Sequence, residues 1–320
     1  MKEISIIIPV YNSQENIEEL SRQINDALQD ISFEVVFIND GSKDRSWDVL
    51  KKLTAVNSNI IAINLRKNFG QDNAIMAGIS HASGNYIVIM DDDLQHSPYD
   101  IIKLYEQCKQ GYDVCYAHFP EKNQQIWKNF GSWLNGVFAY WLLQKPKGIY
   151  MSPFKIIKKE VAKSLLQYSG PFPYIDGLIL DCTENLTSVT VEHYKRYKGK
   201  SNYNLARSFS VFLKTLTSFS VIPLRLATII GFISSVTGFI FAVYFMVQYL
   251  TTNYTVEGWT SLILSLLIIG GILLMLMGLI GEYIGRMYLA VNKKPQYSIG
   301  EIIIQEKPAE NLSQTDRPEN

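Results

Sequence analysis

Short apolar runs alternate with amphipathic stretches along the N-terminal third of the chain. The apolar runs are rich in Ile and Val and are bounded by turn residues, a pattern typical of buried strands. They span residues 4–10, 33–38, 60–65 and 86–90. The stretches between them have helical periodicity and span residues 13–28, 44–56 and 71–81. This alternation predicts βαβ units, and therefore a mostly parallel sheet with helices on both faces.

A different pattern marks the C-terminal third, where two stretches at about residues 226–250 and 262–280 contain no charged residue. Both are close to the roughly 20 apolar residues that a helix needs to cross a bilayer. The loop between them carries Glu257 and no Lys or Arg, whereas both flanks are basic. The flanking basic residues are Lys195, Arg196, Lys198, Lys200, Arg207, Lys214 and Arg225 on one side and Arg286, Lys293 and Lys294 on the other. The positive-inside rule therefore predicts a two-helix transmembrane hairpin with both flanks in the cytoplasm.

An aromatic-rich segment at about residues 124–143 is expected to form a helix in the membrane interface. It carries Trp127, Trp133 and Trp141, and lysines lie on both sides of it. Tryptophan and lysine favour the interface between lipid and water. A core helix is the alternative for this segment. Residues 209–219 are a second candidate for a juxtamembrane helix.

These elements divide the 320 residues into three parts. We expect a cytoplasmic domain over residues 1–205, juxtamembrane and transmembrane helices over 206–290, and a partly disordered cytoplasmic tail over 291–320. The first apolar run is too short for a signal peptide, so the N-terminal domain is expected to stay in the cytoplasm. Lys plus Arg equal Asp plus Glu at 30 each, so net charge indicates no class of partner.

Three consecutive carboxylates, Asp91, Asp92 and Asp93, directly follow the fourth predicted strand. Carboxylates this close repel one another, which favours a bound cation. Mg²⁺ or Mn²⁺ prefers oxygen ligands and would bridge carboxylate and phosphate oxygens. Alternate side chains of an extended segment point the same way, so Asp91 and Asp93 are the expected metal ligands. A solvated acidic turn or a helix cap is the alternative.

Polar residues also follow the other three predicted strands, at the edge where open parallel sheets bind ligands. Asp40, followed by Gly41, is suited to hydrogen-bond a base or ribose, or to cap the next helix. Tyr11 would line a base pocket, with ordinary turn chemistry as the alternative. Asn68 and Gly70 suit a close approach of the backbone to a ligand. The sequence therefore predicts one ligand site along this edge.

These motifs together resemble those of the family 2 glycosyltransferases. The matching strings are SIIIPVYN at residues 5–12, NDGS at 39–42, RxNFG at 66–70 and DxDLQ at 91–95. Beyond them, RxxGxSxY at 196–203, PLR at 223–225 and GEYIGR at 281–286 are similar to one branch of the family. That branch holds bactoprenol glucosyltransferases, undecaprenyl-phosphate aminoarabinose transferases and dolichyl-phosphate-mannose synthases. The resemblance extends to about residue 300.

The resemblance implies an α/β fold with a glycosyltransferase A-type nucleotide-sugar-binding domain. It implies inverting transfer of a sugar from a UDP- or GDP-sugar to a polyprenyl (undecaprenyl) phosphate, with Mg²⁺ or Mn²⁺ as cofactor. The product would be a polyprenyl-phospho-sugar for cell-envelope glycan modification. The protein would be a multi-pass protein of the inner membrane. No nucleic-acid partner is expected, and homo-oligomerisation is left open.

The resemblance also implies roles for individual residues on the donor side. The metal and, through it, the diphosphate would be held by Asp91, Asp93 and Gln95, of which the two aspartates count as catalytic. The nucleoside and the rest of the donor would be bound by Pro9, Tyr11, Asp40, Asn68, Gly70 and Asp92. These residues all lie in the motifs at the strand ends.

On the acceptor side, the resemblance implies that Arg196, counted as catalytic, and Ser201 contact phosphate groups of donor or acceptor. A planar guanidinium suits a phosphate with two parallel hydrogen bonds. A solvated basic patch near anionic lipid is the alternative. A lipid phosphate has a second pKa of about 6 and is a nucleophile without a base. Positioning and charge stabilisation of the leaving diphosphate would then suffice for catalysis.

The chain departs from the family pattern at Ser152, where relatives often carry an acidic residue before Phe-Arg. A serine cannot replace that carboxylate. Asp176, in the string PYIDG at residues 173–177, is a candidate for sugar recognition on the acceptor side. Because Asp-Gly is also an ordinary turn, that alternative stays open. His96, nearest the acidic motif, is either a residue behind the metal ligands or a structural one.

Two other functions compete with lipid-linked sugar transfer. A processive polysaccharide synthase would carry a Gln-x-x-Arg-Trp motif and more membrane spans, and this chain has neither. A membrane-anchored protein that binds a nucleotide-sugar without turnover is the second alternative. The intact Asp91-x-Asp93 pair argues against it.

Overall fold

The computed structural model describes residues 2–119, 149–192, 222–251, 258–292 and 294–305. The chain divides into two compact units. The first comprises residues 1–125, 146–200 and 295–320, and the second comprises residues 126–145 and 201–294. The predicted interfacial helix at 124–143 and the candidate helix at 209–219 lie outside the described residues.

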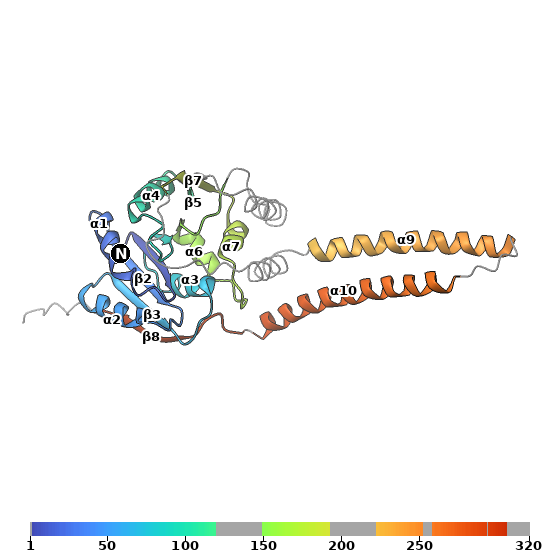
Figure 1. Cartoon of the computed structure of the whole chain (residues 1–320). Helices are drawn as coiled ribbons and strands as arrows, with labels where there is room; N and C mark the ends of the chain where they lie inside the picture. Colours follow the sequence, from blue (N-terminus) through green and yellow to red (C-terminus); the bar gives the residue numbers. More distant parts are fainter. Residues whose placement is uncertain (1, 120–148, 193–221, 252–257, 293, 306–320) are drawn as a thin grey trace, which may run out of the picture. The chain divides into compact units, whose positions relative to one another are not determined.

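An eight-stranded sheet organises the first unit, in the order β7-β5-β6-β4-β1-β2-β3-β8 (Figure 1). The strands are β1 (Ile4–Val10), β2 (Phe33–Asn39), β3 (Ile60–Leu65), β4 (Tyr86–Ile89), β5 (Val114–His118), β6 (Lys155–Lys158), β7 (Leu186–Thr190) and β8 (Ile299–Ile304). Strands β1 to β4 pair in parallel, as the alternating pattern predicts. Strands β6 and β8 are antiparallel to their neighbours.

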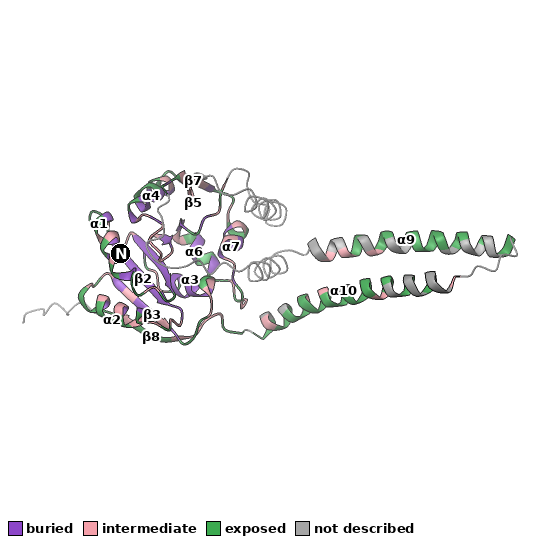
Figure 2. Cartoon of the chain, in the orientation of Figure 1, coloured by how far each residue is buried: buried purple, intermediate pink, exposed green. Residues whose placement is uncertain are grey.

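Helices cover both faces of this sheet. The helices of the first unit are α1 (Ile17–Ala27), α2 (Ser46–Val56), α3 (Gln71–Ile79), α4 (Ile101–Lys109), α6 (Lys159–Leu165) and α7 (Ile175–Cys182). Apolar residues of α1, α2 and α4 pack with alternate residues of β1 and β2 in one core cluster. Helices α3 and α6 lie against strands of the sheet, and α7 lies beside α6. Buried residues gather along the central strands, as Figure 2 shows.

The first two helices begin later than the apolar pattern predicts. Residues 13–16 form a turn before α1, in which the Asn16 amide donates to the Ser13 carbonyl at 3.0 Å, and the Ser13 amide donates to the Ser46 hydroxyl at 3.0 Å. Helix α2 begins at Ser46, whose amide and hydroxyl donate to Asp44 at 3.0 and 2.6 Å. Asp44 therefore satisfies the first amide of α2, and its other carboxylate oxygen accepts the Gln14 amide at 3.1 Å. These bonds also tie the ends of β1 and β2 together.

Strand β8 returns the chain to the first unit after the second unit ends. It pairs with β3, and the Arg66 amide donates to the Ser298 carbonyl at 2.9 Å. The Gln296 side-chain amide donates to two carbonyls, of Tyr168 at 2.7 Å and of Gly170 at 2.9 Å. This strand lies within residues 291–320, for which the sequence predicts only a partly disordered tail.

Two long helices form the described part of the second unit, α9 (Ile222–Thr251) and α10 (Trp259–Val291). They lie side by side (Figure 1). By length and composition, the segment Ile268–Leu289 of α10 is apolar enough to cross a membrane, and none of it is buried. The apolar segment Ala227–Phe241 of α9 is shorter. The structure therefore confirms both helices, and one of them has the length and apolar character of a membrane span.

Candidate functional site

The carboxyl ends of β1, β2, β3 and β4 bring the predicted donor residues to one edge of the sheet. Pro9 is buried within β1, and Tyr11 directly after it is 47% exposed. The segment after β4, residues 91–95, is called the acidic loop. The Tyr11 amide donates to Asp92 Oδ2 at 3.3 Å, which links the end of β1 to this loop. Asp92 is thus turned back toward β1, whereas the Asp91 carboxylate accepts the side-chain amide of Gln71 at 2.8 Å.

The acidic loop is held in place from two sides. The Gln95 amide donates to Asp93 Oδ1 at 3.1 Å, and Leu94 between them has a positive φ of 60°. His96 is buried and stacks with Phe119 and Phe154, with ring centroids 5.5 and 5.2 Å apart. This aromatic stack fixes the loop to segments next to β5 and β6. His96 is therefore a buried residue that packs the acidic loop against these segments, and a role behind the metal ligands stays a prediction.

Asp40 organises the loop after β3. Its carboxylate accepts the amides of Phe69 at 2.7 Å and Gly70 at 2.9 Å, and its carbonyl accepts the Asn68 side chain at 3.1 Å. A Cβ on Gly41, which has φ +65°, would lie 2.5 Å from the Asn68 amide nitrogen. Glycine is therefore required where the loops after β2 and β3 approach each other. This contact between loops is not predictable from the sequence around Asp40, and the nucleoside-binding role of Asp40 stays a prediction.

Electrostatics single out the acidic loop as a site for a cation. Burial, together with the neighbouring Asp93 and Asp92 charges, raises the pKa of Asp91 to about 7. Burial also raises the pKa of Asp92 to about 6, although hydrogen bonds from Ser13 and the Tyr11 amide act in the opposite direction. A divalent cation would reverse both shifts, because it favours the charged carboxylate.

The side chains present fit Mg²⁺ or Mn²⁺ that is shared with a phosphate ligand. Among the described residues, no group of three or more His, Cys, Asp or Glu side chains could hold a metal ion by itself. Asp91 and Asp93 offer hard carboxylate oxygens, and Mg²⁺ commonly binds through one or two carboxylates plus substrate phosphates and water. Gln95 contributes its backbone amide to Asp93. Its role as a metal ligand stays a prediction.

A second polar cluster, which the sequence did not reveal, lies beside the acidic loop. Lys155 at the start of β6 is buried, forms an ion pair with Asp176 Oδ1, and has its ammonium 5.3 Å from the Tyr116 ring centroid. The Tyr116 hydroxyl donates to the same oxygen of Asp176 at 3.0 Å. Asp176 lies in the first turn of α7, so the turn interpretation of Asp-Gly is wrong. We call Tyr116, Lys155 and Asp176 the lysine cluster.

The helix start of α3 connects the lysine cluster to the acidic loop. Gln71 reaches Asp91, and the charges of both Lys155 and Asp176 act on the next residue, Asp72. Burial, with a contribution from Asp176, raises the pKa of Asp72 to about 6. The acidic loop and the lysine cluster are therefore electrostatically one site.

Two predicted residues, Arg196 and Ser201, lie outside the described residues, so their roles stay predictions. Ser152 is buried, and its hydroxyl donates to the Phe154 carbonyl at 2.6 Å. That bond supports the strand start that carries Lys155. Ser152 thus has a backbone-supporting role where relatives of this branch are expected to carry a carboxylate.

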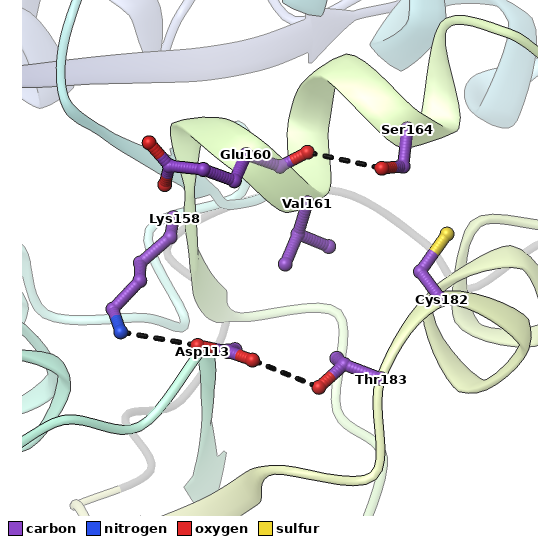
Figure 3. Close-up of a pocket in the computed structure, with 7 residues that line it drawn as sticks. All are labelled: Asp113, Lys158, Glu160, Val161, Ser164, Cys182 and Thr183. Carbon is purple, nitrogen blue, oxygen red and sulfur yellow. Dashed lines mark hydrogen bonds and ion pairs between the residues drawn. The ribbon is translucent and has the colours of Figure 1, made fainter.

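A pocket of about 350 Å³ lies at the other edge of the sheet, near the amino end of β5 (Figure 3). Its lining residues are Asp113, Lys158, Glu160, Val161, Ser164, Cys182 and Thr183. Lys158 and Thr183 both bond to Asp113, at 3.0 and 2.9 Å. Three of its polar side chains thus pair with one another, and the pocket lies away from the acidic loop.

Two family models match the chain. The model described as glycosyl transferase family 2 matches residues 5–166, which include the acidic loop and Lys155. The model described as GtrB C-terminal hairpin matches residues 222–287, which include α9 and most of α10. The first match lies mostly in the first unit, and the second match lies within the second unit.

Similar proteins match along nearly the whole chain. The uncharacterized glycosyltransferase YkcC of Bacillus subtilis (strain 168) is 32% identical over 302 residues, which are 92% of this chain and 92% of that protein. An undecaprenyl-phosphate 4-deoxy-4-formamido-L-arabinose transferase of Edwardsiella ictaluri (strain 93-146) is 32% identical over 318 residues, which are 96% of each chain.

Solved structures share the fold of the first unit. Glucosyl-3-phosphoglycerate synthase from Mycobacterium tuberculosis, in complex with Mn²⁺, UDP and phosphoglyceric acid, has a TM-score of 0.52 at 15% identity. The match covers 68% of this chain and 76% of that chain. At this identity the likeness concerns the fold, an α/β domain of the glycosyltransferase A type with a mostly parallel sheet.

Proposed function

Because this chain belongs to glycosyl transferase family 2 and is a glycosyltransferase, we propose that it transfers a sugar from a nucleotide-diphosphate-sugar to a polyprenyl phosphate. One observation carries the proposal. The loop after β3 that Asp40 holds (the Asp40 loop) is joined to the acidic loop by the Gln71–Asp91 hydrogen bond at one sheet edge. This occurs in a chain whose likeness to an undecaprenyl-phosphate sugar transferase covers 96% of its length. The alternative without turnover does not account for this likeness to an enzyme.

The donor side of the site follows from the sheet order. Asp40 follows β2 and the acidic loop follows β4, with β1 between these strands. A nucleoside near Asp40 and Tyr11 would place its diphosphate at Asp91 and Asp93. The synthase that shares this fold was crystallised with Mn²⁺ and UDP. Bound there, Mg²⁺ or Mn²⁺ would neutralise the diphosphate and stabilise it as the leaving group.

The acceptor phosphate is the nucleophile in the proposed reaction. One of its oxygens attacks the anomeric carbon as the bond from that carbon to the diphosphate oxygen breaks, so the anomeric configuration inverts. The residues of this chain then act by position and charge. Asp91 and Asp93 fix the donor diphosphate, and Arg196 offsets the charge of the incoming phosphate.

A transfer assay tests the proposed function. Purified protein in detergent is incubated with undecaprenyl phosphate, Mn²⁺ and one of a panel of radiolabelled UDP- and GDP-sugars. We expect at least one sugar to enter the lipid-soluble fraction. Label in a water-soluble polymer would instead indicate a polysaccharide synthase, and binding of a sugar nucleotide without any transfer would indicate a non-catalytic protein.

We further propose that α9 and α10 anchor the enzyme in the membrane as a hairpin, with the first unit in the cytoplasm. The chain leaves the first unit before α9 and returns to it at β8. Both ends of the hairpin must then lie on the same side of the membrane. The basic flanks place that side in the cytoplasm. The apolar segment Ile268–Leu289 supports one of the two spans.

Fused reporters test this topology. A reporter after Asn320 should have the activity expected in the cytoplasm, and one inserted near Asn253 should have the activity expected on the far side. The charge bias of the flanks and the return of the chain at β8 motivate this expectation. Cytoplasmic activity at both positions would show that α9 and α10 do not cross the membrane as a pair.

A further inference from the structure

The lysine cluster lies where an extended donor would place its sugar. A nucleotide-sugar is linear, with the diphosphate between nucleoside and sugar. In the sheet, β2 and β4 are two strands apart, and β5 lies two strands beyond β4 on the other side. Neighbouring strands are about 4.8 Å apart, so each step spans roughly 10 Å. If the nucleoside lies at the end of β2 and the diphosphate at β4, the sugar extends over β6 and β5.

The register of β6 with β4 and β5 places the lysine cluster at the carboxyl ends of β4 and β5. Lys155 pairs with Ile89 at the end of β4 on one side and with Tyr116 of β5 on the other. Its charge lowers the pKa of Asp91, against the larger opposing effect of burial. The side chain of Asp176 is 17% exposed, whereas that of Lys155 is 4% exposed. Asp176 is thus the charged member that solvent, or a ligand, can reach.

We propose that Asp176 binds the sugar of the donor, and that Lys155 and Tyr116 position its carboxylate. The assignment rests on the proposed function. Lys155 and Tyr116 both donate to Oδ1 of Asp176, which leaves Oδ2 without a side-chain donor among the described residues. That oxygen accepts a hydroxyl or N–H of the sugar. Because Asp176 faces the donor, this assignment replaces its predicted place on the acceptor side.

The charges around the lysine cluster also define the class of sugar. Asp72, Asp91 and Asp176 lie close enough to act on one another or on Lys155 electrostatically. Lys155 is already paired with Asp176. With Lys155 paired, a sugar carboxylate would meet the charges of Asp176 and Asp72 with no further cation among the described residues of the lysine cluster, which is unfavourable. The site at Asp176 therefore accepts a neutral sugar with hydrogen-bond donors and disfavours a uronic acid.

Calorimetry that compares free nucleotides with sugar nucleotides tests the assignment. The dissociation constants of UDP and UDP-glucose are measured with Mn²⁺ for the full-length protein and for Asp176→Asn, with GDP and GDP-mannose in parallel. Loss of one hydrogen bond to a charged group corresponds to about ten-fold in affinity or more. We therefore expect Asp176→Asn to lower the affinity for the sugar nucleotide about ten-fold and the affinity for the free nucleotide less than two-fold. The affinity for UDP-glucuronic acid is measured in the same way. The ratio of the affinities for UDP-glucose and UDP-glucuronic acid should be smaller in Asp176→Asn than in the wild type.

The positioning role of Lys155 is tested with a double variant. If Lys155 acts through Asp176, then Lys155→Met together with Asp176→Asn should bind the sugar nucleotide no more weakly than the worse single variant. Asp113→Asn is the matched control, because it breaks the Lys158–Asp113 pair at the other end of β6. It should leave the affinities for both ligands unchanged. Melting temperatures of all variants report whether the fold is retained.

Three results would overturn the assignment. An equal loss of affinity for free nucleotide and sugar nucleotide in Asp176→Asn would place Asp176 at the diphosphate. Unchanged affinity for the sugar nucleotide would leave it as a structural residue. Additive losses in the double variant would show that Lys155 does not act through Asp176. A wild-type protein that binds neither UDP nor GDP would contradict the proposed function itself, which is a distinguishable failure.

Discussion

Replacing Asp93 with asparagine should reduce sugar transfer by about 1,000-fold or more. Asp93 follows β4 at the sheet edge where the Asp40 loop and the acidic loop meet. A neutral amide is a poor ligand for a hard divalent cation, and without that cation the diphosphate is a poor leaving group. Transfer is measured as radiolabelled sugar that enters the lipid fraction, at saturating Mn²⁺.

Asp91→Asn should also reduce transfer, although less completely than Asp93→Asn. Its melting temperature also tests whether loss of a carboxylate in this loop lowers transfer through unfolding. Burial and two neighbouring carboxylates raise the pKa of Asp91 to about 7, so the ionised side chain is unfavourable in the folded protein without metal. Asp91→Asn should therefore keep or raise the melting temperature in metal-free buffer. Near-normal transfer by Asp93→Asn in metal-free buffer would contradict the assignment of the metal to this loop.

Arg196→Ala should produce the second large loss of transfer. Two anions, the lipid phosphate and the donor diphosphate, must approach closely for reaction. The metal offsets the charge of the donor, so a further cation is needed for the acceptor. Arg196 lies in the basic segment that precedes α9 in the sequence. A guanidinium can hold a phosphate with two charged hydrogen bonds, each worth about 1.5–3 kcal/mol. We expect Arg196→Ala to lower the transfer rate about 100-fold, because the loss of one such bond near the upper end of that energy range corresponds to about this factor.

Paired measurements distinguish the roles that Arg196 can have. Donor affinity is measured by calorimetry, and the transfer rate is followed as a function of undecaprenyl phosphate concentration. If Arg196 binds the acceptor, donor affinity should change little and Arg196→Lys should restore the rate only in part. Loss of donor affinity with an unchanged dependence on lipid would move Arg196 to the diphosphate. No change in either measurement would contradict a role in the reaction.

The strands and helices that carry the donor site are predictable from local sequence. The four parallel strands are short, mostly apolar runs, and polar residues follow directly at their carboxyl ends. Strand β8 was missed for a physical reason. Its residues, Ile299–Ile304, form a strand because they pair with β3, more than 200 residues earlier in the chain. A short apolar run after a long hairpin does not by itself indicate such a partner.

The lysine cluster shows where local sequence is insufficient. Lysine is rarely buried, and nothing near Lys155 in the sequence indicates that its ammonium meets Asp176, 21 residues later. The pair exists because β6 inserts between β4 and β5 and α7 follows nearby in the fold. The one usable signal was the position of Lys155 directly after Phe154, where relatives of the branch are expected to carry Arg.

The central claim, that a lipid phosphate is the acceptor, is tested most directly with two matched lipids. The protein is incubated with the preferred sugar nucleotide and either undecaprenyl phosphate or undecaprenol, and the lipids are analysed by mass spectrometry. We expect a product only from undecaprenyl phosphate, with the mass of one added sugar. A product from undecaprenol at a similar rate would contradict the claim, because the phosphate would then not be the nucleophile.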